Sequence, residues 1–435
     1  MNRTSSQDSL LEGFISELDL DSLADEAGWS PRSRKVTALG WCLSLCRACS
    51  RGVPSLRTAA LFMGVVCRLT VSKQAIHKRL LLGGDKLLRN VLAAAVAAKA
   101  RLPERKPLGG FARVLIQDST VIALPKSMEA HCPGSSNQHS STAALKIQAV
   151  YDMAGNAFLD FGLSAFTRND QAAAMDILDV VQAGDLVLRD LGFFALASLR
   201  AIADRKAYFL SRYRSDVALV DPRSSKPIAL LAALRGKDSV DMEAQLGASA
   251  RLPVRLVAVK LKQEVADRRR QKAKENRDRR CRPSSEALEL LGWQIMLTNC
   301  PAELLPLNLA CRLYSLRWRI ETIFKSWKSG LKMDAIPSRV SKQELDAFVC
   351  AGLLSATIVH AVVIPWLEQD DPTRGVSVCK LMEIVAISAD LAGADPKDCE
   401  NLLRNLSKHC RYEKRKRRDT LQNWDRLVSE MEHLS

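Results

Sequence analysis

The stretch Arg113-Val-Leu-Ile-Gln-Asp118-Ser-Thr-Val-Ile-Ala-Leu124 marks the point where the chain changes from helical to strand-like patterning. Its β-branched and apolar residues predict a strand, and a single acid, Asp118, stands in the middle of it. A lone carboxylate inside an apolar strand is costly to bury unless a cation lies beside it. Asp118 is therefore the first candidate functional residue.

Further strands and helices are predicted after this strand. Their expected order is strand 145–152, a hairpin turn at 154–156, strand 157–166, helix 170–182, strand 185–190, helix 194–205 and strand 207–213. This order predicts a mixed α/β fold, in which a mixed sheet is flanked by helices. A second acid, Asp190, ends the strand at 185–190, and it would be a neighbour of Asp118 if the two strands pair.

A third polar feature is helical. The segment Tyr314-Ser-Leu-Arg317-Trp-Arg-Ile-Glu321-Thr-Ile-Phe-Lys-Ser-Trp-Lys328 is expected to form one helix. At about 100° per residue, Tyr314, Arg317, Glu321 and Lys328 share an arc of roughly 60° beside an apolar arc. A solvated surface helix would scatter its charges instead. We therefore expect a phenol, two cations and a carboxylate at the rim of a buried face.

Three carboxylates from two strands and a helix suit a site for divalent cations. Asp118, Asp190 and Glu321 are the candidate catalytic residues and metal ligands. Their oxygen atoms favour hard cations such as Mg²⁺ or Mn²⁺. Two such ions, roughly 3.5–4 Å apart, can activate a water or a 3′-hydroxyl and stabilise the leaving oxygen of a phosphodiester.

Composition points to a polyanionic partner. The chain has 435 residues, enough for about three domains, and 64 Lys and Arg against 48 Asp and Glu give a net charge of +16. The alternative is a soluble protein that happens to be basic. The N-terminus has no apolar core of signal-peptide length, so a cytoplasmic protein is expected.

Two patterns have a functional and a structural interpretation, and the structural one is favoured for both. Cys42, Cys46 and Cys49 could suggest a metal, but they lie in an apolar helical pattern and are expected to be structural thiols. Residues 348–367 approach the length of a bilayer span, yet we expect a core helix in which His360 is packed, and no membrane partner.

Helical regions are expected at both ends of the chain. In residues 1–105, Ser72 is a candidate N-cap for a helix that shows Lys73, Gln74, His77 and Lys78 to solvent. This helix could be the second member of a helix-turn-helix that reads DNA, or an ordinary amphipathic helix with a basic face. Residues 334–435 are also predicted to be helical.

The region 214–300 is expected to be an insertion with short strands at 254–261 and 293–298. Between them lies the basic stretch 260–282, with eleven Lys and Arg against four Asp and Glu. Such a run is usually solvated, and on a basic protein it is also a candidate phosphate contact.

The spacing Tyr314-x2-Arg317-x3-Glu321-x6-Lys328 resembles the Y-R-E-K signature of IS4-type DDE transposases. Asp118 and Asp190 match the first two acids of that family. Many members carry an arginine after the second acid, where this chain has Leu191. The departure puts a local phosphate or ion-pair contact in doubt but leaves the three acids intact.

The resemblance implies an RNase H-like catalytic core with a β-rich insertion and flanking helical domains. It implies cut-and-paste transposition of an insertion sequence with two Mg²⁺ or Mn²⁺ ions, in a bacterium and in association with the nucleoid. The double-stranded DNA partners would be the terminal inverted repeats and the target DNA, and the protein would form a homodimer in the synaptic complex. Tyr314, Arg317 and Lys328 would bind phosphates, and Trp293 would stack on a flipped base. The expected domains are 1–105 (helical, DNA-binding), 106–213 (core, first part), 214–300 (β-rich basic insertion), 301–370 (core, second part) and 371–435 (helical, a candidate dimerisation region).

Three alternatives stay open at this point. A transposase-derived regulator would bind DNA ends without cutting them, and a metal-dependent nuclease would cut but never join. A basic helical structural protein would leave Asp118 and Asp190 inside apolar strands without an explanation.

Overall fold

The computed structural model describes residues 10–29, 35–50, 52–99, 108–137, 140–275, 282–371, 374–388, 404–412 and 420–432. The chain divides into two compact units. Unit 1 is formed by Met1–Arg105, Ser119–Arg168 and Arg319–Gln422, and unit 2 by Lys106–Asp118, Asn169–Trp318 and Asn423–Ser435. Two of the five points where the chain passes between the units lie directly after Asp118 and directly after Trp318.

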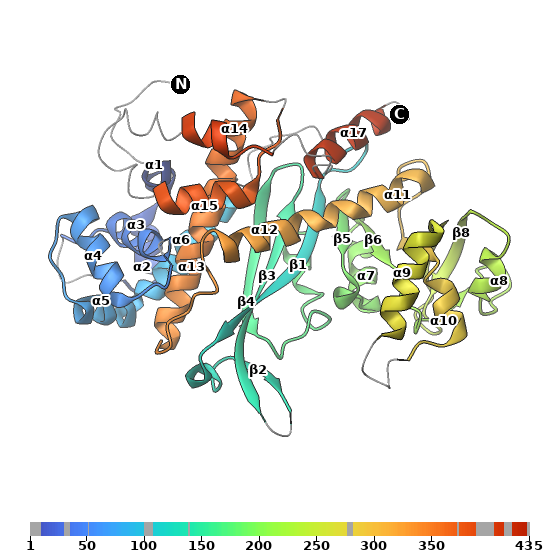
Figure 1. The fold of residues 1–435 in the computed structure, drawn as a ribbon, viewed down its shortest axis with the longest axis horizontal. Coiled ribbons are helices and arrows are strands. Elements are labelled where there is room, and N and C mark those ends of the chain that lie inside the picture. The colour runs from blue at the N-terminus through green and yellow to red at the C-terminus, as the bar shows by residue number, and fades with distance from the viewer. Residues whose placement is uncertain are drawn as a thin grey trace. The chain divides into compact units, whose positions relative to one another are not determined.

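The N-terminal helices of unit 1 follow the apolar runs of the sequence (Figure 1). They are α1 (Leu10–Ser16), α2 (Leu20–Glu26), α3 (Ala38–Cys49), α4 (Leu56–Cys67), α5 (Lys73–Arg79), the π-turn η1 (Leu80–Gly84) and α6 (Asp85–Lys99). The side chains of Thr37, Ser55 and Ser72 each accept a hydrogen bond from a backbone N–H at the start of the following helix. The predicted Ser72 cap is thereby confirmed.

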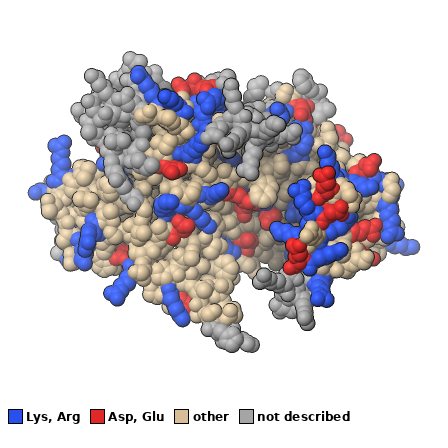
Figure 2. All heavy atoms as spheres, in the orientation of Figure 1, with Lys and Arg blue, Asp and Glu red and all other residues tan. Residues whose placement is uncertain are grey.

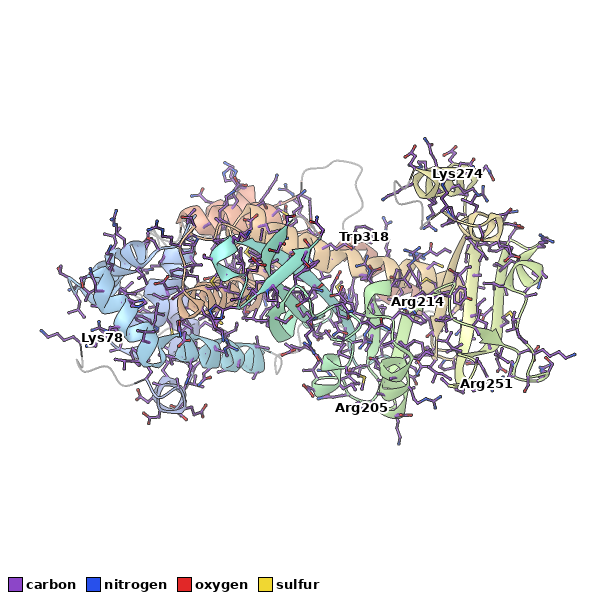
Figure 3. The ribbon with its side chains drawn as sticks, turned by 90° about the horizontal axis from the view of Figure 1, so that it is seen from below. Lys78, Arg205, Arg214, Arg251, Lys274 and Trp318 are labelled. Carbon is purple, nitrogen blue, oxygen red and sulfur yellow. The ribbon has the colours of Figure 1, made fainter. Side chains whose placement is uncertain are left out.

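The basic face predicted for α5 is only partly exposed. Lys73, Gln74 and Lys78 are exposed, and Figure 3 shows Lys78 at the edge of this helical group. His77 is half-buried instead, because its Nδ1 lies 3.2 Å from Glu344 Oε1.

The C-terminal helices of unit 1 include a buried apolar helix. Here lie α12 (Trp318–Ser329, whose first residue belongs to unit 2), α13 (Lys342–Ile358), the π-turn η7 (Val359–Val363), α14 (Ile364–Asp370) and α15 (Val378–Ser388). The continuous segment Lys342–Asp370 is long and apolar enough to cross a membrane, but 94% of its most apolar window is buried inside the protein. It is a core helix, as expected, and the His360 ring packs edge-on against Tyr151 and Phe158.

The three clustered cysteines lie in the core formed by α3 and α13. Cys46 Sγ lies 3.5 Å from Ala351 O, and Cys49 Sγ lies 3.4 Å from Phe348 O. Burial raises the pKa of the Cys46 thiol to about 12. The thiol therefore stays protonated at neutral pH, whereas a metal ligand must be a thiolate.

The first strand of the sheet in chain order is β1 (Val114–Leu124). Its residues 114–118 belong to unit 2 and its residues 119–124 to unit 1. Unit 1 adds η2 (Lys126–Met128), β2 (Pro133–Ser136), β3 (Ser141–Asp152) and β4 (Ala157–Ala165). β3 and β4 form the predicted antiparallel hairpin. The Asp152 carboxylate builds its turn by accepting hydrogen bonds from the N–H groups of Ala154 and Gly155.

Unit 2 carries the parallel part of the sheet. β5 (Leu186–Arg189) pairs in parallel with both β1 and β6 (Tyr208–Arg212), and β10 (Trp293–Thr298) pairs antiparallel with β6. The order continues through β9 (Leu252–Lys260), β8 (Ser239–Leu246) and β7 (Leu219–Val220). The mixed α/β class is thus confirmed, and so are the strands expected at 254–261 and 293–298.

The helices of unit 2 are α7 (Leu196–Asp204), α8 (Leu230–Leu234), α9 (Gln263–Lys274), α10 (Ser285–Leu290), α11 (Leu307–Tyr314) and α17 (Thr420–Glu432), with 3₁₀ turns η3 (Asp176–Asp179), η4 (Leu191–Phe193) and η6 (Ser315–Arg317). α11 packs against β6, β9 and β10. α17 buries Trp424, and its Glu430 pairs with Arg312 of α11. Figure 2 shows Lys and Arg interspersed with Asp and Glu over the region of α9 and α10.

The helix expected at 170–182 is wrong, because only the short turn η3 forms there. The carbonyl groups that a helix would use internally have other donors. Gln117 Nε2 donates to Ala173 O at 3.2 Å, and both Arg189 Nη2 and Ser198 Oγ donate to Ala174 O. Tertiary hydrogen bonds therefore replace the helical ladder.

Candidate active site

Two of the three candidate acids lie side by side in unit 2. In the parallel pairing of β1 and β5, Gln117 stands opposite Arg189, so the residues that follow them, Asp118 and Asp190, occupy adjacent positions. Neighbouring strands are about 4.8 Å apart. Asp118 lies inside β1, whereas Asp190 is the first residue after β5, at its carboxyl end.

Arg317 supplies a cation beside Asp118. Its Nη1 donates to Asp118 Oδ2 at 2.8 Å, and the two side chains are only 7% and 15% exposed. The guanidinium also lies 5.9 Å from the ring centre of Tyr314 and 5.3 Å from that of Trp318. A charge-assisted hydrogen bond at this depth is among the stronger kinds in proteins.

Tyr314 is held in the same group. Its hydroxyl donates to the backbone oxygen of Arg189 at 3.0 Å. Burial raises the pKa of Tyr314 to about 12, and the charge of Asp190 raises it too, whereas Arg317 and Arg212 act in the opposite direction. Tyr314 is therefore a neutral hydrogen-bond donor at physiological pH.

The segment 314–328 is not the single helix that the sequence predicted. α11 ends at Tyr314, the 3₁₀ turn η6 carries Arg317, and α12 begins at Trp318. A 3₁₀ turn rotates by about 120° per residue instead of 100°, so the common arc of roughly 60° does not hold across it. The contacts of Tyr314 with Arg189 and of Arg317 with Asp118 accompany this break.

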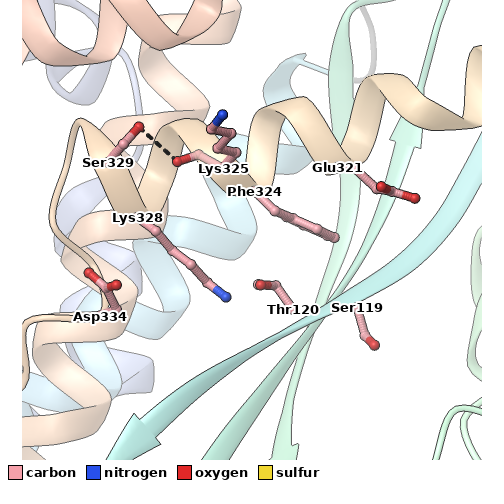
Figure 4. A pocket seen from close by; sticks show the side chains of 8 residues that line it. All are labelled: Ser119, Thr120, Glu321, Phe324, Lys325, Lys328, Ser329 and Asp334. Atoms are coloured by element: carbon pink, nitrogen blue, oxygen red, sulfur yellow. Dashed lines mark hydrogen bonds between the residues drawn. The ribbon is translucent and has the colours of Figure 1, made fainter. Parts of the chain in front are cut away.

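Glu321 and Lys328 lie in unit 1, two turns apart on one face of α12. They line an open pocket of about 560 Å³ together with Ser119, Thr120, Phe324, Lys325, Ser329 and Asp334 (Figure 4). Lys328 Nζ donates to Val121 O on β1 at 2.8 Å. The volume falls in the range of ligand pockets, about 300–1,000 Å³.

The structure therefore gathers the candidate residues into two groups. Asp118, Asp190, Tyr314 and Arg317 form the group in unit 2, and Glu321 and Lys328 form the group in unit 1. Within the described ranges, no three His, Cys, Asp or Glu side chains are grouped closely enough to hold a metal ion. The available donor set is made of carboxylate oxygens, which fits a hard divalent cation.

Trp293 opens β10 and is half-buried, with its backbone oxygen 3.4 Å from Arg269 Nη1. Sequence reasoning passed over a second tryptophan, Trp318, which is 58% exposed (Figure 3). The signal was available, because Trp318 stands directly after Arg317 in the segment that carries the signature.

Two arginines of unit 2, Arg189 and Arg212, also escaped the sequence analysis, whereas Arg269 lies in the basic stretch 260–282 that it named. Arg189, directly before Asp190, is buried and donates to Ser198 Oγ at 2.7 Å and Ala174 O at 2.8 Å; burial lowers its pKa to about 9. The charge of Arg212 lowers the pKa of Tyr314. The pKa of Arg269 is lowered mainly by burial and also by the charge of Arg212. Neither Arg212 nor Arg269 pairs with a carboxylate in the part of the chain that the structure describes. The visible signal for Arg189 was a charged residue inside the apolar run 186–189.

Comparison of the sequence with known protein families identifies the class of protein to which this site belongs. Residues 109–351 match the family model described as "Transposase DDE domain", a range that contains every candidate site residue. The chain belongs to the DDE transposase family. The IS4-type resemblance is thereby confirmed, and the assignment to DNA transposition with it.

Two relatives illustrate the match. The transposase for insertion sequence element IS231F of Bacillus thuringiensis subsp. israelensis is 28% identical over 359 residues, which cover 77% of this chain and 74% of the relative. The putative transposase InsL for IS186A of Escherichia coli strain K12 is 27% identical, with coverages of 80% and 92%. Among solved structures, the piggyBac transposase synaptic complex with hairpin DNA aligns at 11% identity with a TM-score of 0.44, covering 98% of this chain and 84% of that one.

Proposed function

We propose that Asp118, Asp190 and Glu321 together hold two Mg²⁺ or Mn²⁺ ions and that the protein cuts and joins DNA at the ends of an insertion sequence. The observation that supports this proposal most directly is the adjacent placement of Asp118 and Asp190 by the parallel strands β1 and β5. Both residues lie inside the stretch that matches the DDE domain. Glu321 would complete the set from α12, and the RNase H-like core is the fold that the family resemblance implies.

The bound ions would supply Lewis acidity for the attacking oxygen and for the leaving oxygen of the phosphodiester. The residues around them would bind and orient the DNA. Tyr314 would donate its hydrogen bond as a neutral phenol, and Arg317 would offer a planar fork that fits a phosphate. Lys328 would contribute a point charge from the Glu321 face of α12.

A path for the DNA backbone extends from this group across unit 2. Arg212 lies within electrostatic range of both Tyr314 and Arg269, which makes a chain of positive groups leading to the basic helix α9. Bringing two arginines together without a carboxylate is unfavourable unless an anion joins them. A DNA phosphate fits that requirement.

Trp293 stays the proposed platform for an extruded base, and Trp318 is a second candidate because more of its indole is exposed. We also propose residues 1–105 as the domain that recognises the terminal repeats and residues 371–435 as the homodimer contact. Terminal inverted repeats and target DNA would be the substrates, in the cytoplasm and at the nucleoid.

A cleavage assay tests the proposal. Full-length protein is incubated with Mg²⁺ and a labelled duplex that carries the inverted repeat bracketing the gene. Glu321→Gln and Asp190→Asn should abolish nicking and leave end binding largely intact, because each change removes a metal ligand at little steric cost. Asp334→Asn is the matched control, since Asp334 lines the same pocket as Glu321 but lies outside the proposed metal set.

The same assay separates the alternatives, which the family match does not favour. End binding without nicking by the wild-type protein would support a transposase-derived regulator. Nicking without joining of precleaved ends to a target duplex would support a nuclease. Retained cleavage by Glu321→Gln would remove Glu321 from the site.

A further inference from the structure

The ion pair between Arg317 and Asp118 engages two groups that the proposed function needs elsewhere. Arg317 Nη1 lies 2.8 Å from Asp118 Oδ2, and both side chains are largely shielded from water. Asp118 is proposed as a metal ligand, and Arg317 is proposed as a phosphate contact. Neither group can serve its proposed ligand fully while it is bound to the other.

We propose that this ion pair makes metal binding at Asp118 depend on DNA, because Arg317 holds the Asp118 carboxylate until a DNA phosphate takes the guanidinium. The inference rests on the proposed function and adds a form of regulation to it. A cation within hydrogen-bonding distance occupies a carboxylate oxygen and repels a divalent ion. A phosphodiester offers the guanidinium an equivalent, bidentate partner.

The surroundings of Arg317 suit such an exchange. Arg317 lies in the 3₁₀ turn η6 between α11 and α12, and short 3₁₀ stretches between helices often mark hinges. Its guanidinium faces the rings of Tyr314 and Trp318, and Trp318 is well exposed. Because aromatic faces attract a cation whichever anion it binds, the rings would keep the guanidinium near the site as it changes partner.

The exchange predicts a reciprocal coupling between two ligands. If DNA raises the affinity of the protein for the metal, the metal must raise the affinity for DNA by the same factor. Without the arginine, the metal would bind in the absence of DNA and most of the coupling would disappear. A purely structural ion pair would give no such coupling.

Manganese binding to the full-length protein tests this directly, with free Mn²⁺ measured by electron paramagnetic resonance. Without DNA, Arg317→Gln should bind Mn²⁺ about tenfold more tightly than wild type, or more, as loss of a charged hydrogen bond implies. Arg317→Lys should fall between the two, because the charge is kept but the fork is lost. Arg312→Gln, which removes the same charge from the exposed ion pair of Arg312 on α11 with Glu430 on α17, should match wild type.

A second variant and a DNA titration complete the test. The gain should vanish in Asp118→Asn/Arg317→Gln, and the inverted-repeat duplex should tighten Mn²⁺ binding in wild type far more than in Arg317→Gln. If wild type binds Mn²⁺ through Asp118 as tightly as Arg317→Gln does, the inference is wrong while the metal site stands. If no variant binds Mn²⁺ through Asp118, with or without DNA, the proposed site and this inference both fail. Should Arg317→Gln lose its circular dichroism signal, Arg317→Lys decides between the same outcomes.

Discussion

Arg189 and Arg411 are both buried arginines, yet we predict that replacing Arg411 by methionine costs much more stability than replacing Arg189. Both side chains are 2% exposed. Arg189 donates hydrogen bonds to Ser198 Oγ and Ala174 O, and Ala174 O keeps a second donor in Ser198. Arg411 donates instead to four backbone oxygens, those of Leu367, Asp371, Arg374 and Ser407.

The magnitude for Arg189 follows from two opposing terms. Burial lowers its pKa from the usual value of an arginine to about 9, and at about 1.4 kcal/mol per pKa unit the charged form is disfavoured by roughly 5 kcal/mol. Two charged hydrogen bonds return about 1.5–3 kcal/mol each. The terms nearly cancel, so Arg189→Met should change the free energy of unfolding by less than about 2 kcal/mol. Arg411→Met deprives four carbonyl groups of a donor and should cost more than about 3 kcal/mol.

Urea unfolding at pH 7.5, followed by tryptophan fluorescence and far-UV circular dichroism, measures both changes. A loss above about 3 kcal/mol in Arg189→Met, or none in Arg411→Met, would refute the reasoning. If the stability of Arg189→Met is unchanged while DNA cleavage falls, the buried charge is retained for the site beside Asp190 and not for the fold. Wild-type cleavage by Arg189→Met would exclude that role.

The remaining predictions concern DNA binding and pH. Lys328→Ala should weaken the synaptic complex more than initial end binding, and an unchanged salt dependence in a gel-shift titration would argue against a phosphate contact. Arg212→Gln and Arg269→Gln should each reduce the slope of log affinity against log salt by about 0.9, whereas Arg205→Gln, on the exposed end of α7, should leave it unchanged. Stability should fall as the pH rises from about 9 towards 12, because the folded protein keeps several thiols protonated at pH values where the unfolded chain ionises them; urea midpoints that stay constant up to pH 11 would contradict this. The pKa is raised to about 12 for Cys46, Cys300, Cys350 and Cys410.

The strands that carry the two aspartates could be predicted from the sequence because their signal is local. Alternation and β-branched residues mark β1, and an acid inside or directly after an apolar strand stands out against its neighbours. The pairing of β1 with β5 could only be stated as a condition, since register is decided by partners far apart in the chain. The N-cap role of Ser72 could also be predicted, because the side chain of an N-cap serine bonds a backbone N–H only three residues further along the chain.

The two wrong helix predictions, at 170–182 and 314–328, have a common cause. In both segments the local structure depends on contacts with residues that are distant in the sequence. The segment 170–182 has helical periodicity, but Gln117 and Arg189, each from a different strand, donate to its carbonyl groups. The break at 315–317 accompanies the contact of Arg317 with a residue 199 positions away. No window of the sequence contains either partner, so propensity alone gives a regular helix in both places.

The charges of unit 2 explain how two adjacent carboxylates are tolerated inside a folded protein. Asp118 and Asp190 on neighbouring strands would repel each other, and each would resist burial without a cation. Arg317 neutralises Asp118, and Arg212 lies near Tyr314, on which Asp190 also acts. Arg189 adds a buried charge directly before Asp190 in the chain. Because arginines already offset the acids, the proposed exchange would replace these internal partners by a metal on the acids and a phosphate on the arginines. A pair of acids without these arginines would be more costly to bury in the absence of a metal.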